Sequence, residues 1–490
     1  MMRPVLLVLA ALAIGLPAAA QTDDSVVVRA VRRHISVLSH DSLRGRGTPS
    51  RGLESAARYV VRQLTRSGLR PLGDSGRFVQ RYRILRTRLD AESSFVDVDG
   101  PVAASFRLGR QVDWLKVSEP VTRPIAGPAF LLSGLPDSAT PFAGHDVRGA
   151  MVIHLAQMDG ERVEIPDWLL EAAERAGVAA WILVVDRGDE RWRALTALIA
   201  DPRTVVPGQP GVRRFPVLEM RDRSMGVLLT ELGIPYAGVR PIPRITPALQ
   251  PLVGTTVRVT LRERVLSRRS APNVLGLVPG ADSTAPAVLV AAHLDALGVG
   301  PAIGSDSIYN GADDNASGVA AALEAARILA AGPPPPAPVV FAFFSGTEQS
   351  LLGGDFYLGH PAVPLRRTAA MVNVEAVGRN LPDSLAVVGA AQSGLTGTID
   401  ALRPAAAAMG LTVVPDPWPS RRLWLLGDHG RFRERGVPIL YLFNGQHGDL
   451  HRPGDESGKV AFAAVARIAR FVALVAGRLA APRPAEGVAP

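Results

Sequence analysis

Histidine and carboxylate side chains follow one apolar segment after another in the second half of the chain. The first segment ends in His293-Leu294-Asp295, and a Gly/Asn-rich loop then supplies Asp313 and Asp314. Later segments lead to Glu348 and Glu375, and the last stretches supply Asp428, His429, His447, His451 and Asp455. Imidazoles and carboxylates without thiolates are the ligands of Zn²⁺ or a similar divalent cation. The pattern therefore predicts a metal site.

Each of these residues also has a simpler explanation. Asp313 and Asp314 could cap a helix, Glu348 could complement a helix dipole, and His293 could be a hydrogen-bonded structural histidine. To replace the metal site, a separate explanation of this kind would have to hold at every one of these positions. The repetition of ligand-type residues at successive segment ends therefore favours the metal site.

The segments that carry these residues alternate between apolar strands and amphipathic helices. PAVLVAAHLD, APVVFAFFS and AAMVNVEAV are typical strands, and ASGVAAALEAARILAA is a typical helix between them. Continuous apolar strands that alternate with helices predict an α/β fold, with a mostly parallel central sheet covered by helices on both faces. In such a sheet, ligands gather at the carboxyl ends of the strands, where the candidate residues stand.

The texture of the sequence divides the chain into parts. Two amphipathic helical stretches open residues 25–116, which we assign to the N-terminal part of the main domain. Residues 117–250 mix short strands such as AMVIHLA with helices such as PDWLLEAAERAGV, and they predict a small inserted β/α domain. Residues 251–480 form the rest of the main domain, and residues 481–490 are expected to be a disordered tail.

The first 20 residues have the layout of a secretory signal peptide. Arg3 precedes an apolar run that ends at Leu16, and Ala18-Ala19-Ala20 offers a small-residue cleavage site. The run is shorter than the roughly 20 residues that span a bilayer, so we expect cleavage after about Ala20 and a periplasmic or secreted protein without a membrane span. An uncleaved anchor is the alternative. With no cysteine in the chain, export brings no disulfides.

Composition argues against a nucleic-acid partner. The formal net charge is +9, but of the 54 basic residues only Lys116 and Lys459 are lysines, and the arginines are scattered along the chain. A phosphate-binding surface would show clustered basic residues interleaved with aromatic ones. The sequence leaves the oligomeric state open.

Several motifs together resemble a known enzyme family. HLDALG, GADDNASGVA, FFSGTEQSLLGG, NVEAVG, DHGRF and DLHRPGDE, in that order, resemble the motifs of co-catalytic zinc peptidases of the aminopeptidase Y and glutamate carboxypeptidase type. The segment that begins SHDSLRGRGTPSRG is similar to that family's N-terminal helices. HDVRGAMVIHL, AAERAGVAAWILVV and FPVLEM resemble, more loosely, a protease-associated (PA) domain, which such enzymes often carry as an insertion. The resemblance covers nearly the whole mature chain.

The resemblance implies a role for each matching residue. His293 and Glu375 would bind one zinc ion, Glu348 and His451 a second, and Asp314 would bridge both. Aspartate is commoner than glutamate at the position of Glu375. Asp295 would orient the His293 ring, and His429, beside Asp428, would contact the substrate. Two zinc ions would polarise the scissile carbonyl of a peptide substrate and make the attacking water more acidic.

One position departs from the family pattern. The family usually has Gly-Glu-Glu where this chain has Gly346-Thr347-Glu348, and the first glutamate is the general base. Loss of a general base costs about 10²–10⁴ in rate, and a threonine hydroxyl is not basic near neutral pH. Three outcomes stay open: a weak hydrolase, a hydrolase with a substitute carboxylate such as Asp313, or an inactive zinc-containing protein that binds peptides or envelope components. Cyclisation of N-terminal glutamine, as in glutaminyl cyclases, fits less well because those enzymes lack a PA-like insertion.

Overall fold

The structure is a computed structural model, and it falls into two units. It describes residues 24–116, 118–121, 123–137, 140–155, 165–186, 188–190, 192–193, 201–209, 212–234, 236, 247–380 and 382–481. Contacts within the chain join the residues up to Arg81 with those from Ala271 onward into one unit, the main unit. Tyr82–Ser270 form the second unit.

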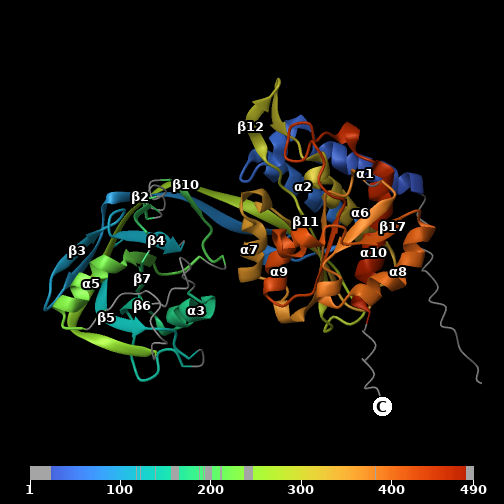
Figure 1. Ribbon diagram of the computed structural model, residues 1–490. Helices are drawn as coiled ribbons and strands as arrows, with labels where there is room; N and C mark the ends of the chain where they lie inside the picture. The colour runs from blue at the N-terminus through green and yellow to red at the C-terminus, as the bar shows by residue number, and fades with distance from the viewer. Residues whose placement is uncertain are drawn as a thin grey trace, which may run out of the picture. The chain divides into compact units, whose positions relative to one another are not determined.

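The main unit contains a mixed, mostly parallel sheet with the order β17-β16-β18-β15-β11-β14-β10 (Figure 1). Strands β11, β14, β15 and β18 run parallel to their neighbours in this group, whereas β10 is antiparallel to β14 and β16 is antiparallel to β18. The strands are β10 (Ala248–Val278), β11 (Ala287–His293), β14 (Val339–Phe344), β15 (Thr368–Glu375), β16 (Ser384–Val388), β17 (Thr412–Pro415) and β18 (Ile439–Phe443). The short β1 (Arg70–Pro71) pairs with β10, and β12 (Gly298–Ile303) and β13 (Asp306–Tyr309) form a separate hairpin.

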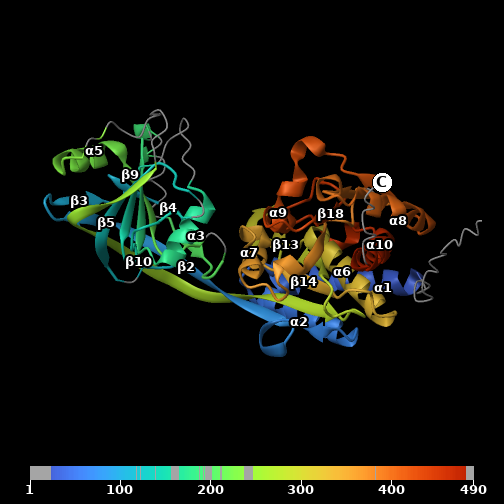
Figure 2. The same ribbon diagram turned by 90° about the horizontal axis from the view of Figure 1, so that it is seen from below.

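Helices cover both faces of this sheet, which confirms the predicted fold class. Helices α1, α6 and α10 lie together although α1 and α10 come from opposite ends of the chain, and α6 and α10 pack on β11 and β15 (Figures 1 and 2). Helices α7 and α9 lie side by side, and α9 packs on β15 and β18 (Figure 2). The helices are α1 (Asp24–Leu38), α2 (Arg51–Arg66), α6 (Gly318–Ala331), α7 (Leu352–Gly359), α8 (Thr396–Ala408), α9 (Gly427–Glu434) and α10 (Phe462–Ala480).

Strand β14 shows why helices can pack on both faces of the sheet. Val340, Ala342 and Phe344 of β14 belong to a core cluster with Tyr357 of α7 and Phe432 of α9. The intervening residues of β14 are also buried, so the strand has no polar face. Side chains of a strand point alternately to its two faces, and an unbroken apolar run therefore requires cover on both.

The second unit has its own apolar core and a sheet with the order β10-β5-β6-β7-β9-β4. Strands β5, β6, β7 and β9 are parallel, and β3 and β8 pair with β2. Its elements are β2 (Val79–Asp99), β3 (Ala104–Arg107), β4 (Val112–Lys116), β5 (Ile125–Ser133), β6 (Met151–Leu155), α3 (Asp167–Ala176), β7 (Ala180–Val185), β8 (Arg203–Val205), β9 (Val217–Arg221) and α5 (Asp222–Glu231).

The division between the units differs from the one expected at residues 117 and 250. The second unit begins at Tyr82 and ends at Ser270. The reason is the length of two strands, because β2 and β10 each begin in one unit and end in the other. A boundary inside a continuous strand leaves no turn or polar loop in the sequence that could mark it.

The chain ends fall outside the described residues. The expected signal peptide, residues 1–20, and nearly all of the expected tail, residues 481–490, belong to the parts that the structure does not describe. Among the helices that are described, none combines the length and the apolar character needed to span a membrane.

Candidate metal centre

The carboxyl ends of three neighbouring parallel strands bring the predicted ligands to one edge of the sheet. His293 is the last residue of β11 and lies opposite Phe344, after which β14 leads into the turn that carries Glu348. Glu375 is the last residue of β15 and pairs with Phe443 of β18. Polar side chains at these positions must meet, because parallel strands end at the same edge.

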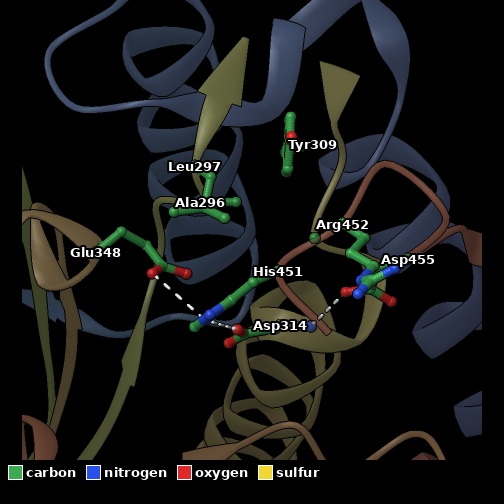
Figure 3. Close-up of a pocket in the computed structure, with 9 residues that line it drawn as sticks. Ala296, Leu297, Tyr309, Asp314, Glu348, His451, Arg452 and Asp455 are labelled. Carbon is green, nitrogen blue, oxygen red and sulfur yellow. Dashed lines mark hydrogen bonds and ion pairs between the residues drawn. The ribbon is translucent and has the colours of Figure 1, made fainter. Parts of the chain in front are cut away.

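Asp314 stands at the centre of the group. It precedes helix α6, and its two carboxylate oxygens lie 3.1 Å from Nε2 of His293 and 2.9 Å from Nε2 of His451. Nε2 of His451 also lies 3.6 Å from Oε2 of Glu348, so Glu348 and Asp314 approach the same ring (Figure 3). One ligand atom from each of His293, Asp314 and Glu348 lies within 4.8 Å of the others.

Glu375 also belongs to the group. It lines a cavity of about 160 Å³ together with Asp314 and His451. The hydroxyl of Tyr441 donates a hydrogen bond of 3.2 Å to Oε1 of Glu375, and the Asn373 amide lies 3.4 Å from the other oxygen. The structure thus brings together all five residues that the sequence predicts as ligands.

The His293 ring is oriented by the main chain of Asp295. Nδ1 of His293 lies 3.1 Å from the carbonyl oxygen of Asp295, whereas the Asp295 carboxylate is 3.9 Å away. The sequence assigned this orienting role to the carboxylate. In the structure that carboxylate instead accepts hydrogen bonds from the Thr48 hydroxyl and the Thr347 main-chain N–H. With Nδ1 as the donor to Asp295, Nε2 of His293 faces Asp314: a protonated ring donates there, and a neutral ring offers a lone pair to a cation.

The charges of this group require a cation or protons between them. Burial, and then the charge of Asp314, raise the pKa of Glu348 to about 8, and burial also raises the pKa of Glu375. The hydrogen bond that His451 donates to Asp314 raises the pKa of His451 to about 9. Burial opposes a charged His293, but Asp314, Glu375 and Glu348 raise the pKa of that ring well above its usual value. Imidazoles and buried carboxylates that lie this close together fit a divalent cation, which would take the place of these protons.

Thr347, at the predicted general-base position, does not stand alone. Its hydroxyl donates a 2.7 Å hydrogen bond to Oδ2 of Asp428, which is 1 % exposed. Burial raises the pKa of Asp428 to about 7. A carboxylate therefore lies one hydrogen bond behind the threonine.

Asp313, the other substitute considered for the base, is turned away from the ligands. One of its carboxylate oxygens accepts a 2.6 Å hydrogen bond from the Gly378 main-chain N–H, and the other lies 3.2 Å from Nε2 of His447. Asp455 accepts hydrogen bonds from the main-chain N–H groups of Asp313 and Asp314 (Figure 3). These contacts hold the loop before α6 and leave Asp314 facing the histidines.

His429 lines the 160 Å³ cavity as a buried, neutral ring. Its ring nitrogens lie 2.9 Å from the Leu423 carbonyl oxygen and 3.2 Å from the Asn373 amide, and burial lowers its pKa to about 4. The ring stacks on Tyr441 with 4.0 Å between the ring centroids. Both nitrogens already have partners, so the ring can meet a substrate through its surface.

Comparison with known proteins decides the family of this region. Residues 273–476 match the family model described as Peptidase family M28. This part of the main unit therefore resembles an M28 peptidase domain. This match places the domain among the metallopeptidase hydrolases, and it includes Thr347, Asp428 and all five predicted ligands. The more specific aminopeptidase Y or glutamate carboxypeptidase type and the PA domain stay predictions.

Individual relatives of the M28 domain are distant. A probable zinc metalloprotease of Pyrenophora teres f. teres is 34 % identical over 118 residues, which are 24 % of this chain and 25 % of that protein. The match thus spans about a quarter of the relative's length. An aminopeptidase from Aneurinibacillus sp. strain AM-1 aligns over 92 % of both chains at 17 % identity with a TM-score of 0.43. A zinc aminopeptidase from Bacillus subtilis aligns over 91 % of this chain and 93 % of its own at 18 % identity, with a TM-score of 0.45.

Two contributors to the M28 site were missed in the sequence. Tyr441 lies in PILYLF, which reads as a plain apolar strand, yet its hydroxyl contacts Glu375. Arg46 is buried, and its guanidinium connects the loops on either side of the site. It donates hydrogen bonds to the main-chain carbonyl oxygens of Leu38, Leu294, Asn310 and Gly311. The sequence offered one signal for each of these two residues. The tyrosine stands near the carboxyl end of a strand, and the arginine belongs to an Arg-Gly repeat.

Proposed function

We propose that this chain is an exported zinc-dependent aminopeptidase with two metal ions and a PA-like second unit. The observation that carries the proposal is the convergence of His293, Asp314, Glu348, Glu375 and His451 at one edge of an M28 domain. No thiolate is present in the chain, and the set of nitrogen and oxygen donors suits Zn²⁺.

The positions of the side chains suggest how the ligands divide. His293 and Glu375 would hold one ion, Glu348 and His451 the other, and Asp314, which contacts both histidines, would lie between the two. When bound, the ions would polarise the scissile carbonyl and acidify the attacking water. The hydrogen bond from Tyr441 keeps Glu375 turned toward this position.

The cavity beside the ligands suggests how a peptide would bind. Its wall includes Leu423, Tyr441 and Phe443, and the carboxylate of Glu375 lies at its edge. An apolar side chain of the first residue fits this wall. Two carboxylates, Asp314 and Glu375, line the cavity against one arginine, Arg421, and this balance favours the positively charged N-terminus of a peptide. These features support removal of N-terminal residues.

A second candidate function follows from Thr347. If the chain has no working base, the same ligands describe a zinc-containing pseudopeptidase that binds peptides or envelope components. The observation in its favour is the absence of a carboxylate at position 347 itself.

Turnover of aminoacyl reporter substrates separates these functions. The zinc-loaded protein should release the reporter, a chelator should abolish the release, and added Zn²⁺ should restore it. His451→Ala removes a predicted ligand, so it should lower the zinc content of the protein. It should also lower the rate by at least about 10²-fold. His360→Ala is the matched control, because His360 is exposed and contacts Phe356, away from the site. Full zinc content without turnover of any reporter would favour the pseudopeptidase.

A further inference from the structure

The contact between Thr347 and Asp428 joins two residues that are 81 positions apart in the chain. Thr347 lies in the short turn after β14, and Asp428 lies in the first turn of α9. The hydroxyl donates to Oδ2 of Asp428 over 2.7 Å, a short distance that is typical of a hydrogen bond to a charged acceptor.

The second oxygen of Asp428 is buried without a hydrogen-bond partner among the described residues. It lies against Gly354 of α7, where a Cβ atom would come within 2.1 Å of Oδ1. An unpaired carboxylate oxygen in the interior costs stability, so such groups call for an explanation. A role in proton transfer provides one, because a buried carboxylate with few partners accepts a proton readily.

Hydrogen bonds from its neighbours also fix the position of Thr347. Its main-chain N–H donates to Oδ1 of Asp295, and the Thr48 hydroxyl bonds both Oδ2 of Asp295 and the N–H of Gly346. The next residue in the chain is Glu348, whose carboxylate lies beside His451. The hydroxyl of Thr347 is therefore held one residue from a predicted metal ligand, on the side of Asp428.

We propose that Thr347 and Asp428 form a two-residue proton relay that replaces the missing glutamate base. The inference rests on the proposed peptidase function. As the attacking water forms its bond to the scissile carbonyl carbon, its proton passes to Oγ1 of Thr347 while the threonine proton passes to Oδ2 of Asp428. When the carbon–nitrogen bond breaks, the proton returns through Thr347 to the leaving amine. Water and peptide are consumed, a carboxylic acid and an amine are formed, and both side chains regain their starting states.

The surroundings of Asp428 support its part as proton acceptor. Burial raises its pKa to about 7, the Thr347 hydrogen bond lowers it, and of the charged groups around it His293 lowers it while Glu375 and Asp295 raise it. A proton acceptor works best when its pKa lies near the operating pH. The ionised form is needed, so kcat/KM should rise as the pH passes through the pKa of Asp428 in the loaded enzyme.

Variants at both positions test the relay. Thr347→Val removes the hydroxyl at nearly constant shape and should lower kcat/KM by about 10²-fold, whereas Thr347→Ser keeps a hydroxyl and should stay within about tenfold of the wild type. Asp428→Asn should cost a similar factor and remove the rise of kcat/KM near neutral pH. Asp355→Asn is the matched control, because Asp355 is a buried acid of the adjacent helix α7 that pairs with Arg431. Its kcat/KM and pH profile should match the wild type.

Zinc content and melting temperature are measured for every variant, so that loss of metal or fold is separated from loss of proton transfer. An infrared readout does not depend on turnover. The spectrum of the zinc-loaded wild type minus that of Asp428→Asn isolates the Asp428 carboxyl band as a function of pH. Thr347→Val should raise the titration midpoint of that band, because the ionised carboxylate loses a hydrogen bond.

The outcomes distinguish the relay from the function on which it rests. If the wild type cleaves reporters and Thr347→Val is equally fast with the same pH profile, the relay is wrong and the peptidase function stands. If the wild type is inert while Thr347→Glu is active, the site is competent and the relay is again wrong. If both proteins bind zinc and neither cleaves any reporter, the peptidase function fails and the relay fails with it. An unchanged infrared midpoint in Thr347→Val also overturns the relay.

Discussion

At the scale of single residues, several ionisable side chains of the candidate metal centre lie close together in the interior of the main unit. Asp314 accepts from two histidines at once, and Glu348 lies 3.6 Å from one of them. Without a cation, some of these groups must keep protons that they would release in water. The stability of the metal-free protein is therefore linked to pH.

This linkage gives a prediction for the metal-free protein. The pKa of Glu348 is raised from 4.5 to about 8, and that of His451 from 6.5 to about 9. Both groups bind protons more strongly in the folded state, so the stability that they contribute is present at low pH and lost as the pH rises through 8 and 9. The melting temperature of the chelator-treated protein should fall between about pH 4.5 and pH 9, most steeply above pH 6.5 where both groups contribute, and thermal unfolding monitored by circular dichroism measures it.

Bound Zn²⁺ should make the melting temperature of the loaded protein much less dependent on pH, because the cation takes the place of the protons. Glu348→Gln is the control and should flatten the slope of the metal-free protein. Equal slopes with and without zinc would contradict the linkage.

Sequence reasoning grouped the candidate ligands but not their supporting contacts, for a physical reason. His293 and Glu375 end parallel strands, and the topology of an α/β sheet forces such residues together. The contact of Thr347 with Asp428 depends instead on how α9 packs on the sheet, and no local spacing encodes that packing. The same holds for Tyr441, whose ring belongs to the apolar core and whose hydroxyl belongs to the site.

At the scale of secondary-structure elements, α7 and α9 position the proposed relay. Phe344 of β14 lies close to the rings of Tyr357 in α7 and Phe432 in α9, with centroids 5.6 and 6.0 Å away. Rings at these distances stabilise the contact between the two helices and the sheet. Gly354 allows the close approach of α7 to Asp428.

Gly354→Ala tests this packing. The added Cβ would stand 2.1 Å from Oδ1 of Asp428, so the helix or the carboxylate must move. Overpacking of this kind costs about 1–3 kcal/mol, and urea unfolding should show that loss of stability together with a lower kcat. Gly397→Ala in α8 is the matched control, because nothing lies within 4 Å of its Cβ position, and it should be neutral or stabilising by up to about 1 kcal/mol. Equal effects of the two substitutions would refute the close packing.

At the scale of the whole molecule, the sequence predicted two structural parts but not their limits. The core of the second unit is built from residues such as Leu89, Val96 and Phe106, which the sequence had assigned to the main domain. These residues lie in β2 and β3, and their alternation of buried and exposed positions suits any half-buried sheet. Periodicity reveals that a strand is covered, but not which core covers it.

Export through cleavage of residues 1–20 is a prediction about the whole chain. The mature protein should begin just after Ala20, and intact-mass measurement of protein from the periplasm or the medium checks this end. Ala20→Trp should block cleavage, because the processing site needs small residues. Recovery of the full-length chain from the membrane fraction would show that residues 1–20 act as an anchor.

The hydrogen bond from Thr347 to Asp428 also bears on how the chain can evolve. Threonine codons have the form ACN and glutamate codons the form GAR, so more than one base must change to place a glutamate at position 347. The single-base steps toward glutamate encode alanine, asparagine or lysine, and none of these side chains has a hydroxyl. Each step would remove the hydroxyl of the proposed relay before a new carboxylate arrived. A lineage that relies on this contact would therefore retain threonine, or exchange it for serine, even though the family resemblance predicts glutamate at this position.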